Sequence, residues 1–387
     1  MRPRSAMLVV LLTLQALGRT AGQQANHSIS ARGTSGLISG LAQFKRQWAH
    51  QKLARLLSLL TVVRFHNGPC VTPHGVAGTC YHRLECASRG GAAGGHCARG
   101  FGVCCYFVRT CGQQSDQNCT YFVNPGFPAA YVNGQPSECV LTISKRSPKV
   151  TQLRLDFKIF ELEAPRNGTC TVDQFTVSGQ NRNSIIPVLC GNNTGNHIYM
   201  DVDSSNGPFQ LSVSQGGGNF PRRFKIKVTQ LRPGDRLESP RNCLQYYVGV
   251  RGSFHSFNYE GPNAGYLNNL NYAICIRKEA GYCSITYTNE DVFQLVNVDE
   301  DGEPTVPPGQ AGAGAVSCTD DYIIVTGLGL RLCGDRLNDA SVNIDFTQDA
   351  PVTDTSNGPF IVGVRTNNEV TGRGFHLMYR QNICGMT

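Results

Sequence analysis

From Cys111 onward the chain consists mainly of short stretches in which apolar and polar residues alternate. A strand that buries one face shows this period of two, and many such strands at short spacing are typical of a β-sandwich or a barrel. Turn-forming residues such as Asn124-Pro125-Gly126 separate the stretches. The pattern therefore predicts an all-β architecture. The clearest strands are expected at residues 141–143, 153–157, 175–177, 209–213 and 224–228.

An internal repeat divides this β-rich region into two modules. The pentapeptide Ser-Asn-Gly-Pro-Phe occurs at residues 205–209 and again at 356–360. Leu-Cys-Gly recurs in the same way, and a Cys-x-x-Asp motif precedes it in both halves, in the same order. We therefore expect three parts, namely a first β-sandwich at 111–231, a polar linker at 232–242 and a second sandwich at 243–384. An acid-, Pro- and Gly-rich insert near 299–316 predicts a mobile surface loop.

The first 66 residues have a different pattern. Arg2 and Arg4 precede an apolar run over 7–17 and small residues up to Gly22, which predicts a signal peptide at 1–22. That run is shorter than the roughly 20 residues that cross a bilayer. Within residues 23–66, a polar stretch predicts disorder, and apolar residues at steps of three and four then predict a basic amphipathic helix. Such a helix could bind a membrane surface, self-associate or pack on the following domains, or it could be a removed pro-segment.

Residues 67–107 are rich in cysteine and glycine. Six cysteines are expected to form three disulfides here, because so short a segment cannot bury a sufficient core. His82 and His96 raise the alternative of a zinc site, but the cysteine spacings lack the paired pattern of zinc ligands. The sequence alone leaves the pairing of the six cysteines open.

The charge is unevenly distributed along the chain. The formal net charge is +8, but residues 1–66 hold nine Lys and Arg and no Asp or Glu, so the remainder is close to neutral. A basic patch on a folded domain is therefore not expected, and nucleic acid is not an expected partner. Seventeen cysteines favour an oxidising, extracellular compartment, and the chain is expected to be secreted.

Motifs of common enzymes are missing from the sequence. It contains no Gly-Asp-Ser-Gly-Gly segment of a serine protease, no His-Glu-x-x-His zinc motif and no glycine-rich phosphate loop after a strand. The chain is therefore expected not to be an enzyme.

Both modules resemble CUB domains, which are extracellular jelly-roll β-sandwiches. The first carries Asn124-Pro-Gly-Phe-Pro, Cys139-x-Leu-Thr-Ile, Phe160-Glu-Leu-Glu, Cys170-x-x-Asp and Leu189-Cys-Gly. The second, more divergent module keeps Cys318-x-x-Asp-Tyr, Cys333-Gly and Gly374-Phe-x-Leu-x-Tyr. The layout resembles secreted CUB proteins of arthropods, and the segment at 67–107 is similar to a clip-type knot in Cys70-x-Thr-Pro, Gly78-x-Cys and Cys104-Cys105.

The two resemblances imply a set of disulfides. The clip-type knot implies Cys70–Cys104, Cys80–Cys97 and Cys86–Cys105. The CUB domains imply Cys119–Cys139, Cys170–Cys190, Cys243–Cys275 and Cys318–Cys333, and Cys283 and Cys384 remain to pair with each other. Cys111 is then unpaired. It would form an intermolecular bond or stay a free thiol, or the pattern is reshuffled, for example to Cys111–Cys384.

The resemblance also implies a calcium site, because many CUB domains bind Ca²⁺ through carboxylates. In the first module Glu163 and Asp173 match two of the positions, but the third falls near Ser214 and Gln215. In the second module Asp321 matches, without a preceding glutamate. Calcium is the only cofactor that these residues suggest. Glycosylation sequons stand at Asn26, Asn118, Asn167 and Asn192.

Three functions agree with this layout. The first is a secreted, non-catalytic recognition, adhesion or scaffold protein that binds extracellular proteins or glycans. The second is a cofactor, decoy or inhibitor of extracellular serine proteases in an immune or developmental cascade. The third is a matrix or cuticle component that forms homo-oligomers through the N-terminal helix or Cys111.

Overall fold

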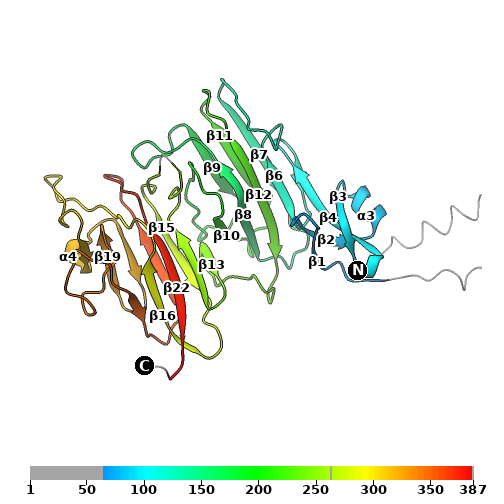
Figure 1. The fold of residues 1–387 in the computed structure, drawn as a ribbon. Coiled ribbons are helices and arrows are strands. Elements are labelled where there is room, and N and C mark those ends of the chain that lie inside the picture. Colours follow the sequence, from blue (N-terminus) through cyan, green and yellow to red (C-terminus); the bar gives the residue numbers. More distant parts are fainter. Residues whose placement is uncertain (1–63, 262–263, 386–387) are drawn as a thin grey trace, which may run out of the picture. The chain divides into compact units, whose positions relative to one another are not determined.

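The computed structural model describes residues 64–261 and 264–385. The chain divides into two units, Met1–Arg64 and Phe65–Thr387, and the strands described below belong to the second (Figure 1). The signal peptide and the polar segment expected in residues 1–66 lie outside the described residues. The same is true of the amphipathic helix and of the sequon at Asn26.

The cysteine-rich segment at 67–107, called the knot below, forms a small antiparallel sheet with one short helix. Its elements are β1 (Pro69–Val71), β2 (Ala77–Tyr81), α3 (Arg83–Ser88), β3 (Ala92–Cys97), the 3₁₀ turn η1 (Ala98–Gly100) and β4 (Gly102–Arg109). The His82 side chain caps α3 by accepting a hydrogen bond from the Leu84 N–H. At Gly91 a Cβ atom would lie 2.4 Å from the Cys105 sulfur, so glycine is required for the close approach.

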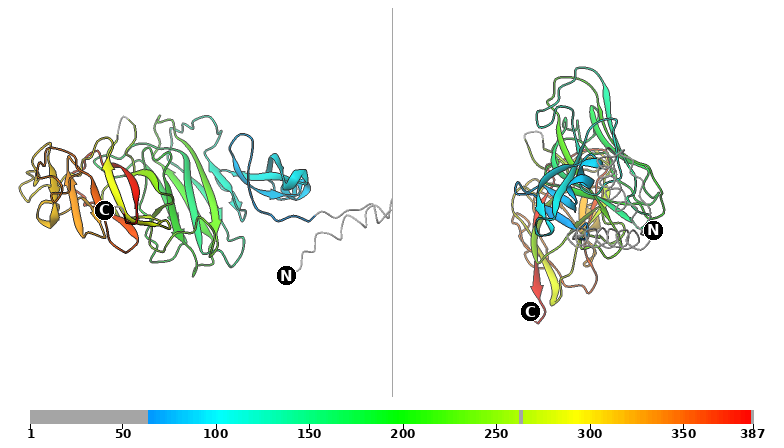
Figure 2. Two further views of the ribbon diagram at one scale, coloured as in Figure 1. Left: turned by 60° about the horizontal axis from the view of Figure 1, so that its bottom comes forward. Right: turned by 90° about the vertical axis from the view of Figure 1, so that its right-hand side faces the viewer.

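The knot is joined to the first domain through a shared sheet. Strand β4 pairs in parallel with β6 (Thr120–Val123), with Phe107 opposite Thr120. The resulting sheet has the order β1-β2-β4-β6-β12-β8-β10, and β3 also pairs with β4. The left view of Figure 2 shows the knot, coloured blue to cyan, beside the strands of the first domain.

The first domain is a sandwich of two sheets. The strands β8 (Gln152–Glu161), β10 (His197–Asp201) and β12 (Arg223–Leu231) complete the sheet that the knot extends. The second sheet has the order β5-β7-β11-β9, formed by β5 (Gln114–Ser115), β7 (Ser137–Ile143), β11 (Phe209–Gln215) and β9 (Asp173–Ser178). Phe157, Phe160 and Phe175 pack between the sheets with ring centroids 4.6–5.7 Å apart.

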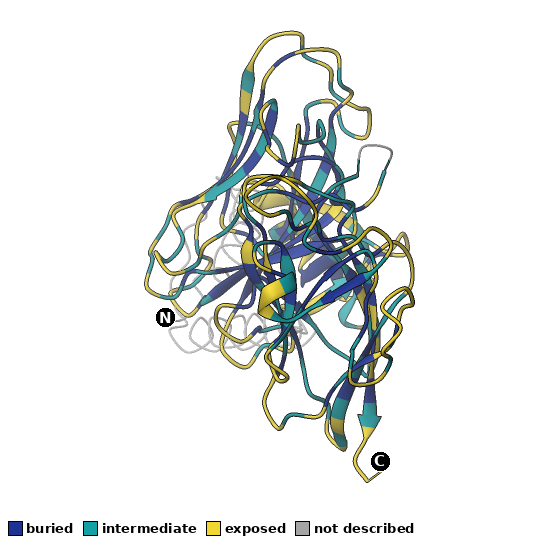
Figure 3. Ribbon diagram, turned by 90° about the vertical axis from the view of Figure 1, so that its left-hand side faces the viewer, coloured by how far each residue is buried: buried dark blue, intermediate teal, exposed yellow. Residues whose placement is uncertain are grey.

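The second domain repeats this plan. One sheet has the order β13-β15-β21-β18-β19-β17 and the other β14-β22-β16-β20. Their strands are β13 (Gln245–Tyr247), β14 (Arg251–His255), β15 (Asn271–Ile276), β16 (Tyr282–Asn289), β17 (Ala311–Ala313), β18 (Tyr322–Val325), β19 (Leu330–Gly334), β20 (Val352–Asp354), β21 (Phe360–Arg365) and β22 (His376–Ile383). The prediction of an all-β fold is confirmed, because the described part of the chain has only short helices beside its strands. Buried positions concentrate on the strands and exposed ones on the loops (Figure 3).

The insert near 299–316 is more ordered than expected. It ends in β17, which pairs with β19, and in the short helix α4 (Gly314–Ser317). The Thr305 hydroxyl donates to the Ser317 carbonyl over 2.8 Å, so the insert is also tied to itself. Residues 299–310 thus form the surface loop that was predicted, whereas residues 311–317 are ordered because β17 pairs with a sheet edge and α4 follows it.

The segment at 232–242 is held to the first domain by side-chain hydrogen bonds. The buried Gln152 side chain donates to the Ser239 carbonyl over 2.9 Å and accepts from the Ser239 N–H over 3.0 Å. The Tyr199 hydroxyl donates to the Leu237 carbonyl over 2.9 Å. Directly after the segment, the Tyr199 N–H donates to the Leu244 carbonyl over 2.8 Å. The polar segment at 232–242 is therefore fixed to the first domain, and we call it the strap. Its composition predicted only a linker, because the composition does not show that Gln152 supplies hydrogen-bond partners.

Eight disulfides form in the structure. They are Cys70–Cys104, Cys80–Cys97, Cys86–Cys105, Cys111–Cys139, Cys170–Cys190, Cys243–Cys275, Cys283–Cys384 and Cys318–Cys333. Cys119 is the free cysteine, and it is buried. The expected Cys119–Cys139 bond and the unpaired Cys111 are therefore corrected.

The reason for this correction is the sheet in which each cysteine lies. Gly112 donates its N–H to the Val140 carbonyl over 2.8 Å, which brings the Cα atoms of Cys111 and Cys139 to 4.5 Å. Cys119 instead lies in the turn just before β6, which belongs to the opposite sheet, and its thiol is hydrogen-bonded with the Thr79 side chain of the knot. An intermolecular bond through Cys111 is not available while Cys111 is paired within its own domain.

Candidate functional site

The buried carboxylate of Asp173, at the start of β9, is paired with a buried arginine. Arg222, which directly precedes β12, is fully buried, and its Nε donates to Asp173 Oδ2 over 2.8 Å. The same guanidinium donates to the carbonyl of Gly217 over 2.7 Å and to that of Phe220 over 3.3 Å. A charged side chain that is completely buried is stable only when paired and hydrogen-bonded, as this one is.

Glu163 lies beside Asp173 and Arg222, two residues after β8. We call this group of residues the corner of the first domain. Its backbone N–H donates to Asp173 Oδ2 over 2.9 Å. Its carboxylate is 3.8 Å from Arg222 Nη2 and 3.7 Å from Arg166 Nη2. The structure thus brings Glu163 and Asp173 together, as the resemblance implied, but around the guanidinium of Arg222.

These residues do not fit a calcium ion. Ca²⁺ takes six to eight oxygen ligands. Here Asp173 Oδ2 and the Gly217 and Phe220 carbonyl oxygens accept hydrogen bonds from the Arg222 guanidinium instead. Within residues 64–261 and 264–385, no three or more His, Cys, Asp or Glu side chains are placed to hold a metal ion together.

Asp321 occupies the corresponding corner of the second domain. It is 1% exposed, as is Asp173, and it directly precedes β18. The Tyr266 hydroxyl donates to Asp321 Oδ2 over 2.5 Å, and the Asn367 N–H donates to Oδ1 over 2.7 Å. Burial raises the pKa of Asp321 to about 6, against the opposing effect of these hydrogen bonds. Both oxygens already have donors, so this corner does not fit a cation either.

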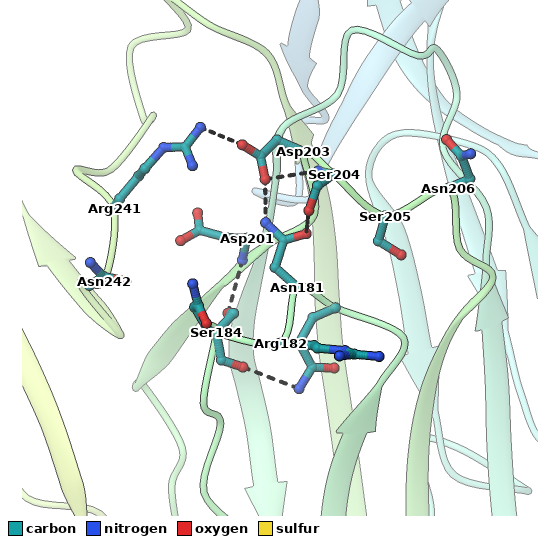
Figure 4. Close-up of a pocket in the computed structure, with 12 residues that line it drawn as sticks. Asn181, Arg182, Ser184, Asp201, Asp203, Ser204, Ser205, Asn206, Arg241 and Asn242 are labelled. Atoms are coloured by element: carbon teal, nitrogen blue, oxygen red, sulfur yellow. Dashed lines mark hydrogen bonds and ion pairs between the residues drawn. The ribbon is translucent and has the colours of Figure 1, made fainter.

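A polar hollow lies at the end of the first domain where the strap enters the second (Figure 4). It has a volume of about 800 Å³, and we call it the strap hollow. Its lining consists of amide, hydroxyl, carboxylate and guanidinium side chains. The lining residues are Gln180, Asn181, Arg182, Asn183, Ser184, Asp201, Asp203, Ser204, Ser205, Asn206, Arg241 and Asn242.

Asp203 organises one wall of the strap hollow. Its carboxylate accepts hydrogen bonds from Asn181 and from Arg241 of the strap, and the Ser204 hydroxyl donates to the Asn181 side-chain oxygen over 2.7 Å (Figure 4). The Gln180 side-chain oxygen is buried and has no hydrogen-bond partner. The lining therefore offers both donors and acceptors to a polar partner.

The sequence analysis did not identify the strap hollow. Three separate segments line it, from the loop after β9, the loop after β10 and the strap. A signal was present in the dense Asn, Ser and Asp of 180–184 and 201–206, but such composition is equally typical of turns.

The sequons differ in accessibility. The Asn118 side-chain oxygen accepts from the N–H groups of Cys119 and Gln230, and Thr120 of the same sequon is fully buried. Asn192 is half-buried and caps the Thr194 N–H. Asn167 is exposed.

Two family models match the two sandwiches of this chain. The CUB domain model matches residues 111–226, and the animal CUB domain model matches residues 240–382. The CUB1-EGF-CUB2 domains of rat MASP-1 are 18% identical, with a TM-score of 0.24, over 69% of this chain and 99% of that one. The CUB1-EGF-CUB2 domain of human MASP-1/3 is 16% identical, with a TM-score of 0.25, over 68% and 98% of the two chains. No curated protein matches the chain. Since the two family models match the two sandwiches in turn, this chain contains two CUB domains in series.

Proposed function

We propose that this chain is a secreted, non-catalytic recognition protein that binds an extracellular protein at the strap hollow. CUB domains typically mediate protein–protein interactions and are generally non-catalytic. The observation that carries the proposal is the strap hollow itself, a large polar concavity formed jointly by the first domain and the strap.

The surroundings of the strap hollow suit a protein partner. Ile185 is 73% exposed and directly follows the lining residue Ser184, and Val188 nearby is 43% exposed. Protein interfaces combine a buried apolar contact with a polar rim that supplies hydrogen bonds. Two acidic and two basic side chains line the hollow, so specificity would come from hydrogen bonds rather than from net charge.

An extracellular location is supported by the disulfides. Eight disulfides in one chain require an oxidising compartment to form and persist. Asn167 is the sequon we expect to carry a glycan, because its side chain is exposed and that of Asn118 is engaged in the fold. Among the described residues, no helix is long and apolar enough to cross a membrane.

The test uses a matched pair of exposed isoleucines. The purified chain and its Ile185→Asp and Ile344→Asp variants are cross-linked to proteins of the surrounding extracellular fluid, and captured proteins are quantified by mass spectrometry. Ile344 is 87% exposed on a loop of the second domain and serves as the control. We expect a partner that Ile185→Asp loses at least tenfold and Ile344→Asp retains.

The identity of that partner separates the alternatives. A serine protease captured through the strap hollow would favour the regulatory function, and capture of the chain itself would favour a matrix component. A partner retained equally by both variants would contradict binding at the strap hollow.

A further inference from the structure

Each CUB domain buries one aspartate at the same place in its sequence, three residues after a disulfide-bonded cysteine. We infer that the first CUB domain carries its own cation at this corner, the Arg222 guanidinium, and that the Tyr266 hydroxyl satisfies the equivalent aspartate of the second. Asp173 Oδ2 and both carboxylate oxygens of Asp321 then have donors from the protein itself, Asp173 Oδ1 is buried without a hydrogen-bond partner, and the chain folds independently of Ca²⁺. This inference does not rest on the proposed function.

The oxygen atoms around Arg222 are those that a bound cation would require. Asp173 Oδ2, the Gly217 carbonyl and the Phe220 carbonyl lie 2.7–3.3 Å from guanidinium nitrogens, and Glu163 Oε2 lies 3.8 Å away. One side chain thus gathers two carboxylates and two backbone carbonyls. A metal ion and the guanidinium cannot occupy the same space.

The charges of the corner are already balanced. Two carboxylates, Glu163 and Asp173, face two guanidinium groups, Arg166 and Arg222. A divalent cation added here would leave a local excess of positive charge in a partly desolvated site, which is unfavourable.

The guanidinium also holds the loop that directly precedes β12. Arg222 binds the carbonyls of Gly217 and Phe220 through its side chain. Its backbone exchanges two hydrogen bonds with Tyr131, of 2.7 and 3.0 Å. Gly217 has a φ of 88°, and a Cβ there would lie 3.0 Å from the Gly134 carbonyl, so the loop has little freedom.

The second domain satisfies its buried aspartate, Asp321, with neutral hydrogen-bond donors. The Tyr266 ring is 1% exposed, and its hydroxyl donates to Asp321 while accepting from the Val296 N–H over 3.1 Å. Asn367, which stands near the expected third ligand position, contributes its backbone N–H to Asp321. Its side-chain oxygen accepts from the Glu369 N–H over 2.9 Å, so it is engaged in its own turn.

The experiment compares thermal unfolding of the purified chain in millimolar CaCl₂ and in EGTA, with isothermal titration of CaCl₂ as a second readout. We expect the same midpoint in both buffers and no binding heat. A midpoint raised by Ca²⁺, or a saturable binding heat, in the wild-type chain would overturn the inference.

The neighbouring arginines supply a matched pair of variants. Arg222→Ala should lower the midpoint by roughly 10 °C in EGTA, since it leaves Asp173 buried without a cation. Arg223→Ala should change it little, because the Arg223–Glu161 pair is 41% and 34% exposed. Arg222→Lys keeps the charge and covers the case in which Arg222→Ala does not fold. If Arg222→Ala and Arg222→Lys both unfold at the wild-type midpoint, the guanidinium does not organise the corner and the inference is wrong.

Discussion

The two CUB domains of this chain bury the same aspartate but satisfy it differently. Asp173 accepts a hydrogen bond from the fully buried guanidinium of Arg222, which carries a full charge. Asp321 accepts hydrogen bonds from the phenol of Tyr266 and from a backbone N–H, and neither of these donors carries a net charge. Arg222 comes from the end of the first domain, whereas Tyr266 comes from the beginning of the second.

The difference shows how a repeated fold can keep a buried carboxylate while replacing its partner. With a cationic partner, the carboxylate and the guanidinium compensate each other for the loss of water. With neutral donors only, burial raises the pKa of Asp321 to about 6. The free energy of unfolding of the second domain should therefore depend on pH through the titration of Asp321. The first domain instead relies on an ion pair at the equivalent position.

The largest expected effect is the loss of the guanidinium. Removing one partner of a buried ion pair costs about 3 kcal/mol or more, so Arg222→Ala should lower the free energy of unfolding by that amount. Arg223→Ala, which removes a solvent-exposed pair, should cost far less than Arg222→Ala. Urea unfolding followed by circular dichroism measures both. Equal losses in the two variants would show that burial of the pair does not matter.

A smaller loss is expected in the second domain from Tyr266→Phe. The variant keeps the ring but removes the donor to Asp321 and the acceptor of the Val296 N–H. A buried carboxylate without its donor costs about 1 to 3 kcal/mol, and this cost should shrink at low pH, where Asp321 is protonated. Urea unfolding at neutral and mildly acidic pH tests this, and a loss that does not depend on pH would contradict it.

Protonation of Asp321 should give a further, smaller effect. Because its folded-state pKa is raised to about 6, the folded state binds this proton at a pH at which the unfolded state has lost it. Stability therefore decreases as pH rises from about 4 through about 6. Relative to Asp321→Asn, the wild-type chain should gain about 1 kcal/mol between about pH 7 and about pH 5. Urea unfolding of both proteins at the two pH values measures this gain. The same difference in free energy of unfolding between the two proteins at both pH values would rule the prediction out.

The smallest effect concerns the odd cysteine of the first domain, which the second domain lacks. Cys119 is buried against the knot, and burial raises the pKa of its thiol. A thiol reagent should therefore label one cysteine per chain after non-reducing unfolding and almost none in the native protein. Cys119→Ser should keep all eight disulfides, whereas Cys111→Ser should leave Cys139 free. Labelling of Cys111 in the wild-type chain would contradict the observed pairing.

The strands were the most predictable feature, because their signal is local. Residues 141–143, 153–157, 175–177, 209–213 and 224–228 fall on β7, β8, β9, β11 and β12. Alternation of apolar and polar residues follows directly from burial on one face of a strand. The repeated Cys-x-x-Asp motif likewise singled out Asp173 and Asp321 as candidate ligands, and the structure buries both, as it also buries Asp156 and Asp354.

The partners of these residues could not be predicted in the same way. Arg222 lies 49 residues from Asp173 and Tyr266 lies 55 residues from Asp321. The alternation that buries Phe224 and Ile226 also places Arg222 on the inward face, but it does not reveal that Asp173 is its partner. The cysteines illustrate the same limit, since Cys111 and Cys119 are close in sequence but lie in turns next to opposite sheets.

The sequence by itself determined the all-β class, the repeat that underlies the two CUB domains and the Cys-x-x-Asp motif that contains Asp173 and Asp321. These properties follow from local periodicity and from motifs that the chain repeats. The tertiary structure alone decided that a guanidinium pairs with Asp173 and that a phenol donates to Asp321. It also decided that Cys111 pairs with Cys139 and that three distant segments form the strap hollow. The physical reason is that each of these features brings together residues from segments that are separate in the sequence, and only the folded arrangement of strands and loops places them within bonding distance.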